Sequence, residues 1–135
     1  MEDCIFCKIV AGDIPSHKVY EDNTAYAFLD IQPSNIGHTL VIPKEHSRNA
    51  LAMSDDNFAM LMRIVHHVAH AVKKGVGAEG VNIILNNENV AGQKVFHTHA
   101  HIVPRFANDG HEWWVHKHFS EDETKKATEK ITSLL

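Results

Sequence analysis

Three histidines stand at every second position in the run H-T-H-A-H-I-V-P, which extends from His97 to Pro104. In a helix this spacing would scatter the imidazoles around the axis, whereas the side chains of a β-strand alternate between its two faces. We therefore expect a strand over residues 95–103 that Pro104 closes. His97, His99 and His101 would then point to one face, with neighbouring rings roughly 6.5 Å apart.

A row of three imidazoles on one face indicates either a metal site or a phosphoryl-transfer site with a histidine nucleophile. The plainer interpretation is a solvated strand face in a chain that holds 12 histidines. Strict alternation is not what composition alone would produce, so we favour a functional row.

Both cysteines of the chain lie together, as Cys4-Ile5-Phe6-Cys7. Such a pair can be a redox motif, half of a zinc site or two unrelated thiols. A thioredoxin-like motif would follow a first strand, and only three residues precede Cys4, which disfavours the redox interpretation. Zinc would need two more ligands, and without a second C-x-x-C they would have to be histidines.

The composition is that of one globular domain. The chain has 135 residues, of which 44% are hydrophobic and 22% charged, with a net charge of −4. We therefore expect no nucleic-acid partner, and no apolar stretch approaches the roughly 20 residues that cross a bilayer. The acidic start M-E-D-C is unlike the basic start of a secretory signal, so we expect a cytoplasmic protein.

Short β-rich segments lie on both sides of one long helical segment. Segment 8–14 has the composition of one helical turn followed by a loop, and segment 31–37 has that of a loop. Strands are expected at 18–21, 24–30, 38–43 and 81–86, in addition to the histidine strand. Because strands and helices do not alternate, we predict an α+β fold with about five antiparallel strands and helices against one face.

The long helix should begin after Ser54 and end at Gly75 or Gly77. Its apolar stripe includes Phe58, Leu61, Val65, Val68 and Val72, which recur at helical spacing. His66, His67 and His70 fall on the other side, and because no glutamate follows the first of them, we interpret them as surface residues.

A last helix should start at a capping box formed by Ser120 and Glu123. Its buried side would hold Ala127, Ile131 and Leu134. Trp113 and Trp114 precede it in a segment without periodicity, where packing or dimer contacts are the expected role.

The run G-Q-K-V-F-H-T-H-A-H-I-V-P resembles the signature of the histidine triad (HIT) family. Four other motifs match its Hint-like branch in the same order: C-I-F-C-K-I-V, G-D-I-P, F-L-D-I and G-H-T-L-V-I-P-K-E-H. The resemblance implies a single HIT domain over residues 1–135, well matched over 1–106 and followed by a variable tail at 107–135.

The resemblance implies a role for each matching residue. His99 would be the nucleophile that forms a covalent nucleotidyl-histidine, with its other ring nitrogen donating to a backbone carbonyl of the same strand. His101 would contact the phosphate and protonate the leaving group. The implied substrate-binding residues are Asp30 at the ribose, Ile31 beside the base, Asn86 and Gln93 near the phosphate, and His38 close to the site.

Family members that keep C-x-x-C bind a structural zinc ion, and no catalytic metal is required. The implied zinc ligands are Cys4, Cys7, His46 and His97. Lys94 departs from the family pattern, which has a small hydroxyl residue there, so the leaving-group preference stays open.

The function implied is hydrolysis of purine nucleoside 5′-phosphoramidates by a homodimer. One alternative is dinucleoside polyphosphate hydrolysis, as in the Fhit branch, which carries other residues at Asp30 and Asn86 and lacks the zinc set. Another is a nucleotide-binding interaction module whose hydrolysis is incidental.

Overall fold

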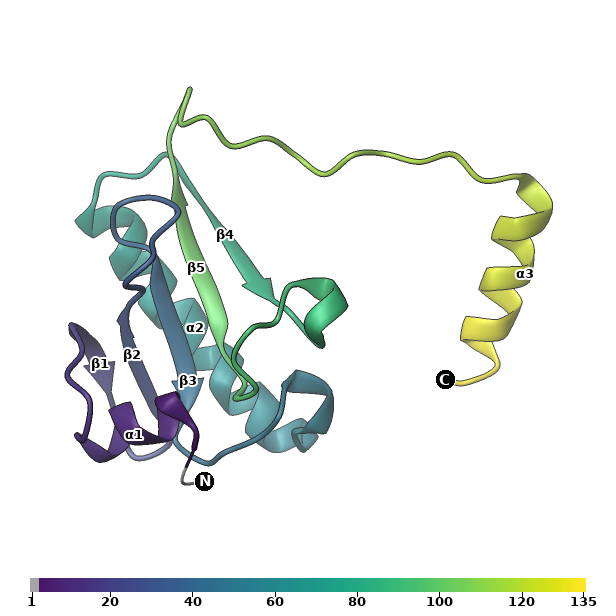
Figure 1. Cartoon of the computed structure of the whole chain (residues 1–135). Coiled ribbons are helices and arrows are strands. Elements are labelled where there is room, and N and C mark those ends of the chain that lie inside the picture. Colours follow the sequence, from purple (N-terminus) through teal and green to yellow (C-terminus); the bar gives the residue numbers. More distant parts are fainter. Residues whose placement is uncertain (1–2) are drawn as a thin grey trace.

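The computed structural model describes residues 3–135, and its centre is one five-stranded sheet (Figure 1). The strands are β1 (Lys18–Glu21), β2 (Ala25–Leu29), β3 (Thr39–Pro43), β4 (Gly80–Leu85) and β5 (Ala100–Arg105). They lie in the order β1-β2-β3-β5-β4, and every neighbouring pair is antiparallel. The predicted α+β architecture is therefore confirmed.

The long helix α2 (Asp55–Gly75) covers one face of the sheet (Figure 1). Ser54 Oγ caps it by accepting the N–H of Asn57, as the sequence indicates. Four apolar side chains of α2 pack against the strands: Leu61, Val65, Val68 and Val72. Their partners on the sheet include Val41 and Ile102, and this layer is the larger part of the core.

The helix α1 (Ile5–Ala11) covers part of the opposite face. Phe6 and Ile9 are buried there against Phe28, Leu40 and Ile42. The sequence prediction placed only a helical turn at 8–14, which was too late in the chain. The helix starts directly after Cys4, because the Cys4 Sγ caps it by accepting the N–H of Cys7.

The histidine strand is shorter at its start than predicted. β5 begins at Ala100, so His97 and His99 lie in an irregular segment before the ladder, and the strand continues through Pro104 to Arg105. The backbone around His97 is otherwise engaged: its carbonyl accepts the His99 ring at 2.7 Å, and the Thr98 N–H donates to Ser47 O at 2.8 Å. Pro104 is tolerated near the end of the strand, opposite Val81.

The C-terminal segment leaves the sheet as an extended arm that ends in α3 (Glu121–Thr132) (Figure 1). The predicted cap is present, since Ser120 Oγ accepts the N–H of Glu123 at 3.1 Å. The predicted buried side of the helix is wrong for the single chain. Ile131 and Leu134 are 60% and 87% exposed, because α3 stands away from the sheet.

Two short 3-10 turns, Ala50–Ala52 and Asn89–Ala91, complete the secondary structure of the described residues. Among residues 3–135, no helix has the length and apolar character needed to cross a membrane.

Candidate active site

The histidine face is the side of the sheet that α1 covers in part. His101 lies on β5 opposite Leu40 of β3, and Leu40 belongs to the apolar cluster under α1. The rings of His99 and His101 have their centroids 5.0 Å apart, closer than the spacing expected for a regular strand. Phe6 of α1 packs edge-on against His99, with ring centroids 5.1 Å apart. The helix therefore helps to hold this ring in place.

His99 has one nitrogen engaged by its own backbone. Its Nδ1–H donates to the carbonyl oxygen of His97 at 2.7 Å. A carbonyl can only accept, so the neutral ring carries its proton on Nδ1 and leaves the Nε2 lone pair available. Burial lowers the pKa of His99 from its ordinary value, which keeps the ring neutral. This is the state that a nucleophilic imidazole requires.

A chain of hydrogen bonds sets the tautomers of His38 and His101. The backbone N–H of Ser34 donates to His38 Nδ1 at 3.0 Å, so the neutral His38 ring carries its proton on Nε2. That Nε2–H donates to His101 Nδ1 at 2.9 Å. The neutral His101 ring must then carry its proton on Nε2, which makes Nε2–H a donor beside His99.

Burial is the main cause that keeps this pair neutral. It lowers the pKa of His101 to about 4, and the neighbouring His99 and His38 contribute to the decrease. Burial also lowers the pKa of His38, although the Asp30 carboxylate, 3.6 Å from His38 Nε2, opposes the change. The rings of His38, His99 and His101 are therefore neutral at pH 7.

Asp30 and Ile31 lie just beyond the end of β2. Asp30 is 19% exposed, and its Oδ1 accepts the N–H of Gln32 at 2.8 Å. Ile31 is 85% exposed, so an apolar side chain stands free next to the carboxylate. On the other side, Asn86 follows β4 and lies against Gly92, whose φ of +100° and lack of a side chain permit the approach.

Gln93, which the resemblance places near the phosphate, has its side chain bonded to neighbouring loops. It is 0% exposed, and both ends of its amide bond to the chain. Its Oε1 accepts the N–H of Glu88, and its Nε2 donates to the carbonyls of Arg48 and Val95. The side chain thus ties the loop after β4 to Arg48, which follows β3, and to Val95, which precedes the histidines.

Four ligand atoms from Cys4, Cys7, His46 and His97 meet where α1 faces the end of β3. Cys4 Sγ lies 3.4 Å from His97 Nδ1, and Cys7 Sγ lies 3.4 Å from His46 Nδ1 and 3.5 Å from His97 Nδ1. Zinc bonds of about 2.3 Å to sulfur and about 2.0 Å to nitrogen at tetrahedral angles put these atoms about 3.5 Å apart. The donor set and its geometry fit a tetrahedral zinc ion.

The outer side of His97 also suits metal binding. Its Nε2–H donates to the Pro43 carbonyl at 2.7 Å, so Nδ1 presents a lone pair toward the thiols. A second group, Asp30, His38 and His101, also has its ligand atoms close together. There the hydrogen bond between the two rings accounts for the proximity without a cation.

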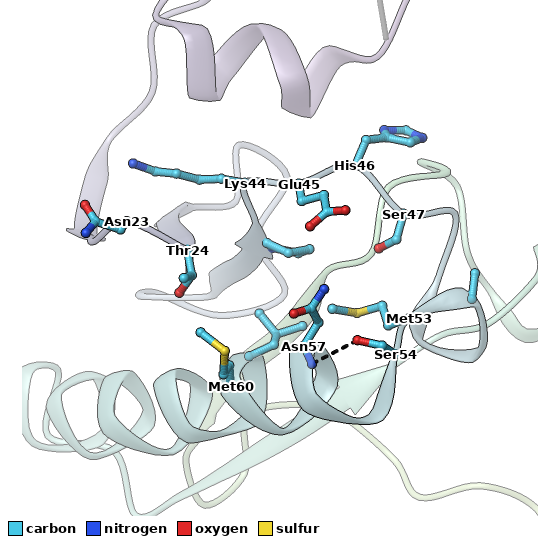
Figure 2. Close-up of a pocket in the computed structure, with 14 residues that line it drawn as sticks. Asn23, Thr24, Lys44, Glu45, His46, Ser47, Met53, Ser54, Asn57 and Met60 are labelled. Atoms are coloured by element: carbon cyan, nitrogen blue, oxygen red, sulfur yellow. Dashed lines mark hydrogen bonds between the residues drawn. The ribbon is translucent and has the colours of Figure 1, made fainter.

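Other polar features lie away from the triad. A pocket of about 360 Å³ opens between Thr24, Lys44, Asn57 and Met60, with His46 and Ser47 at one end (Figure 2). Lys94, the departure from the family pattern, lines a separate pocket with Arg48 and Phe96 beside Cys4. His66 and His70 are exposed, as predicted, with their Nε2 atoms 3.3 Å apart.

Comparison with protein families gives a match to the HIT domain over residues 11–108. An uncharacterized HIT-like protein of Borreliella burgdorferi is 49% identical over 112 residues, which cover 82% of this chain and 81% of that protein. The adenosine 5′-monophosphoramidase hnt1 of Schizosaccharomyces pombe is 41% identical over 133 residues, 96% of each chain. The adenylylsulfatase HINT3 of Arabidopsis thaliana is 39% identical over 79% of this chain and 54% of its own length.

Two crystal structures superimpose on nearly the whole chain. SMU.412c from Streptococcus mutans UA159 has a TM-score of 0.93 at 51% identity and covers 98% of this chain and 85% of its own. A member of the HIT family from Bacillus subtilis has a TM-score of 0.91 at 41% identity, with 98% and 97% covered.

The buried amide of Gln93 yields a prediction about stability. Gln93→Ala should lower the free energy of unfolding by about 1–3 kcal/mol, because it removes a fully buried side chain that bonds to the Glu88 N–H and to the carbonyls of Arg48 and Val95. Urea denaturation of the two proteins measures this difference. Lys94→Ala, at the exposed neighbouring position, is the control and should change stability by less than about 0.5 kcal/mol. Equal stabilities for Gln93→Ala and the parent chain would contradict a stabilising role of the buried Gln93 amide.

Proposed function

Because the chain belongs to the HIT domain family, we propose that it hydrolyses purine nucleoside 5′-phosphoramidates at the α-phosphate. The observation that carries the proposal is the hydrogen bond from His99 Nδ1 to the His97 carbonyl, which leaves Nε2 as an unprotonated nucleophile. Relatives named as an adenosine 5′-monophosphoramidase and an adenylylsulfatase support hydrolase chemistry on an adenosine nucleotide.

In the first step, His99 Nε2 attacks the α-phosphorus and the bond from phosphorus to nitrogen breaks. The product is a nucleotidyl-histidine whose Nδ1–H stays bonded to the His97 carbonyl. The departing nitrogen keeps the electron pair and leaves as the amine, because it enters the step already protonated from solvent. His101 Nε2–H donates a hydrogen bond to a phosphate oxygen, and the hydrogen bond from His38 Nε2–H to His101 Nδ1 keeps that donor in place.

In the second step, water attacks phosphorus and displaces His99. The hydroxyl stays on the nucleoside monophosphate, and the other proton of the water passes to solvent, which balances the proton that left with the amine. Every donor in this scheme is an N–H group, so the proposal requires no catalytic metal. Asn86 would hold a phosphate oxygen from the other side.

The nucleoside would lie over the end of β2. The Asp30 carboxylate can accept two hydroxyl hydrogens of a ribose, and Ile31 offers an exposed apolar surface to a purine. Cys4, Cys7, His46 and His97 would hold a structural zinc ion, which supplies a cross-link between α1 and the histidine segment. We also propose that the active form is a homodimer.

The proposed nucleophile can be tested directly. His99→Ala should abolish hydrolysis of adenosine 5′-phosphoramidate while the chain still folds and binds AMP, because His99 is not among the four residues of the cysteine cluster. The measurement is the rate of AMP release from the phosphoramidate, compared with the rate of cleavage of a diadenosine polyphosphate. His66→Ala, on the exposed side of α2, is the control. Nucleotide binding without turnover in the parent chain would favour an interaction module, and faster dinucleotide cleavage would favour the Fhit-type activity.

The pH dependence follows from the buried rings. Because burial lowers the pKa of His99 from 6.5, the nucleophile stays neutral as the pH falls through 6.5. The acidic limb of kcat/KM should therefore have its midpoint below pH 6.5, and His66→Asn should not move it. A midpoint at or above 6.5 would contradict the assignment of His99 as a buried nucleophile.

Zinc binding can be measured independently of activity. The purified chain should hold one zinc ion, detected by native mass spectrometry, and Cys7→Ser should lose it together with thermal stability. The matched control is Ser16→Cys, which adds a thiol away from the cluster. A parent chain that refolds from metal-free denaturant with the same stability whether or not zinc is added would contradict the proposal.

A further inference from the structure

The loop between β2 and β3 carries three groups of the candidate active site. Asp30 and Ile31 lie at its start, and the backbone N–H of Ser34 donates to His38 Nδ1 at 3.0 Å. The loop has no regular secondary structure, and its two isoleucines, Ile31 and Ile36, are 85% and 72% exposed. Apolar packing therefore does not hold this loop, and its position depends on directed hydrogen bonds.

Asn35 attaches the loop to the end of β5. Its Nδ2 donates to the Pro104 carbonyl at 2.8 Å and to Asp109 Oδ2 at 3.0 Å, so both hydrogens of the amide are used. The Asp109 carboxylate is itself fixed, because the Arg105 guanidinium donates to it at 2.9 and 3.2 Å. The same guanidinium holds the pKa of Asp109 well below its usual range. Asn35 is therefore bonded to a charged acceptor with a fixed position.

His111 attaches the same loop one residue earlier. Its Nε2–H donates to the carbonyl oxygen of Ser34 at 2.8 Å. The backbone of His111 is held in turn, since its N–H donates to Asp109 Oδ1 at 3.1 Å and its carbonyl accepts from the Arg105 guanidinium at 3.3 Å. Ser34 and Asn35 are thus bonded to the end of β5 and to the turn after it, where β3 begins beside them (Figure 1).

The Ser34 N–H selects between two arrangements of the rings of His38 and His101. In the structure, His38 accepts from Ser34 at Nδ1 and donates from Nε2 to His101 Nδ1 at 2.9 Å. If the Ser34 N–H turned away, the neutral His38 ring could carry its proton on Nδ1 and accept at Nε2 from His101 Nδ1–H. His101 Nε2 would then present a lone pair instead of a donor, and this lone pair would repel a phosphate oxygen.

The Asp30 carboxylate does not make this selection by itself. It lies 3.6 Å from His38 Nε2, which is longer than a hydrogen bond between these atoms, whereas the contact from the Ser34 N–H is 3.0 Å. The tautomer of His38 therefore depends on the orientation of one backbone N–H group. That orientation depends in turn on the bonds that hold the Ser34 carbonyl and the Asn35 side chain.

We propose that Asn35 and His111 are positioning residues that set the tautomers of His38 and His101. Both act through Ser34, whose N–H they keep directed at His38 Nδ1, and so they keep His101 Nε2–H available as a donor to the phosphate. The effect on turnover rests on the proposed hydrolysis. The tautomers themselves can be measured without any substrate.

The tautomers are measured on the full chain from the 15N chemical shifts of the assigned histidine rings. In the parent chain, His38 and His101 should both carry the proton on Nε2. His111→Ala and Asn35→Ala should each shift His38 toward the Nδ1–H form, whereas His111→Gln keeps a side-chain N–H of similar reach and should retain the parent pattern. His116→Ala, at an exposed histidine further along the chain, is the matched control. Parent tautomers in either alanine variant, or a His111→Gln chain that behaves like His111→Ala, would overturn the proposal.

Turnover of adenosine 5′-phosphoramidate in the same samples separates the positioning from the proposed function. His111→Ala should lower kcat/KM on the order of tenfold, the effect of about one hydrogen bond in the transition state, and His111→Gln should recover the loss. Circular dichroism confirms that each variant is folded. Shifted tautomers with an unchanged kcat/KM would overturn the effect on catalysis. A parent chain without turnover would refute the proposed hydrolysis, and the tautomer measurement would still decide the positioning.

Discussion

The carbonyl of His97 is the constraint on which the histidine site depends. It accepts the Nδ1–H of His99, which sets the tautomer of that ring, and it is thereby withdrawn from the sheet. The ring of the same residue donates to Pro43 and turns Nδ1 toward the two thiols. One residue thus connects α1, the end of β3 and His99. A displacement of α1 would therefore shift His99 both through His97 and through Phe6, which packs on the rings of His97 and His99.

Burial and directed hydrogen bonds cooperate in the rest of the site. Three imidazolium cations close together would repel one another, and burial of the rings of His38, His99 and His101 favours their neutral forms. Hydrogen bonds then determine which nitrogen of each neutral ring carries the proton. The backbone N–H of Ser34 sets the tautomer of His38, and His38 Nε2–H sets the tautomer of His101. A backbone donor outside the sheet therefore determines which proton faces His99.

Much of this arrangement could be predicted from the sequence, because alternation and helical periodicity report burial directly. The five antiparallel strands, the stripe on α2 and the cap at Ser54 are local patterns of that kind. The start of β5 could not be predicted, since it depends on which partner takes the His97 carbonyl. The buried contacts of Gln93 could not be predicted for a similar reason: an amide side chain can bond to a phosphate or to backbone groups, and only the fold shows that this one bonds to the backbone. The apolar side of α3 is a helical pattern in the sequence, but a pattern does not say what it packs against, and these side chains are exposed in the single chain.

The loop after β4 contains a residue with a strained backbone, Glu88, which several side chains hold in place. Glu88 has a φ of +78° with a ψ of 157°, a conformation that costs a side-chain-bearing residue about 1–3 kcal/mol. The surrounding contacts fix it there: Arg48 pairs with the carboxylate, Asn49 donates to it, and Gln93 accepts the Glu88 N–H. Because Gln93 also bonds to Val95, the strained residue and the histidine segment share one partner. The strained conformation of Glu88 and the buried contacts of Gln93 therefore stabilise each other.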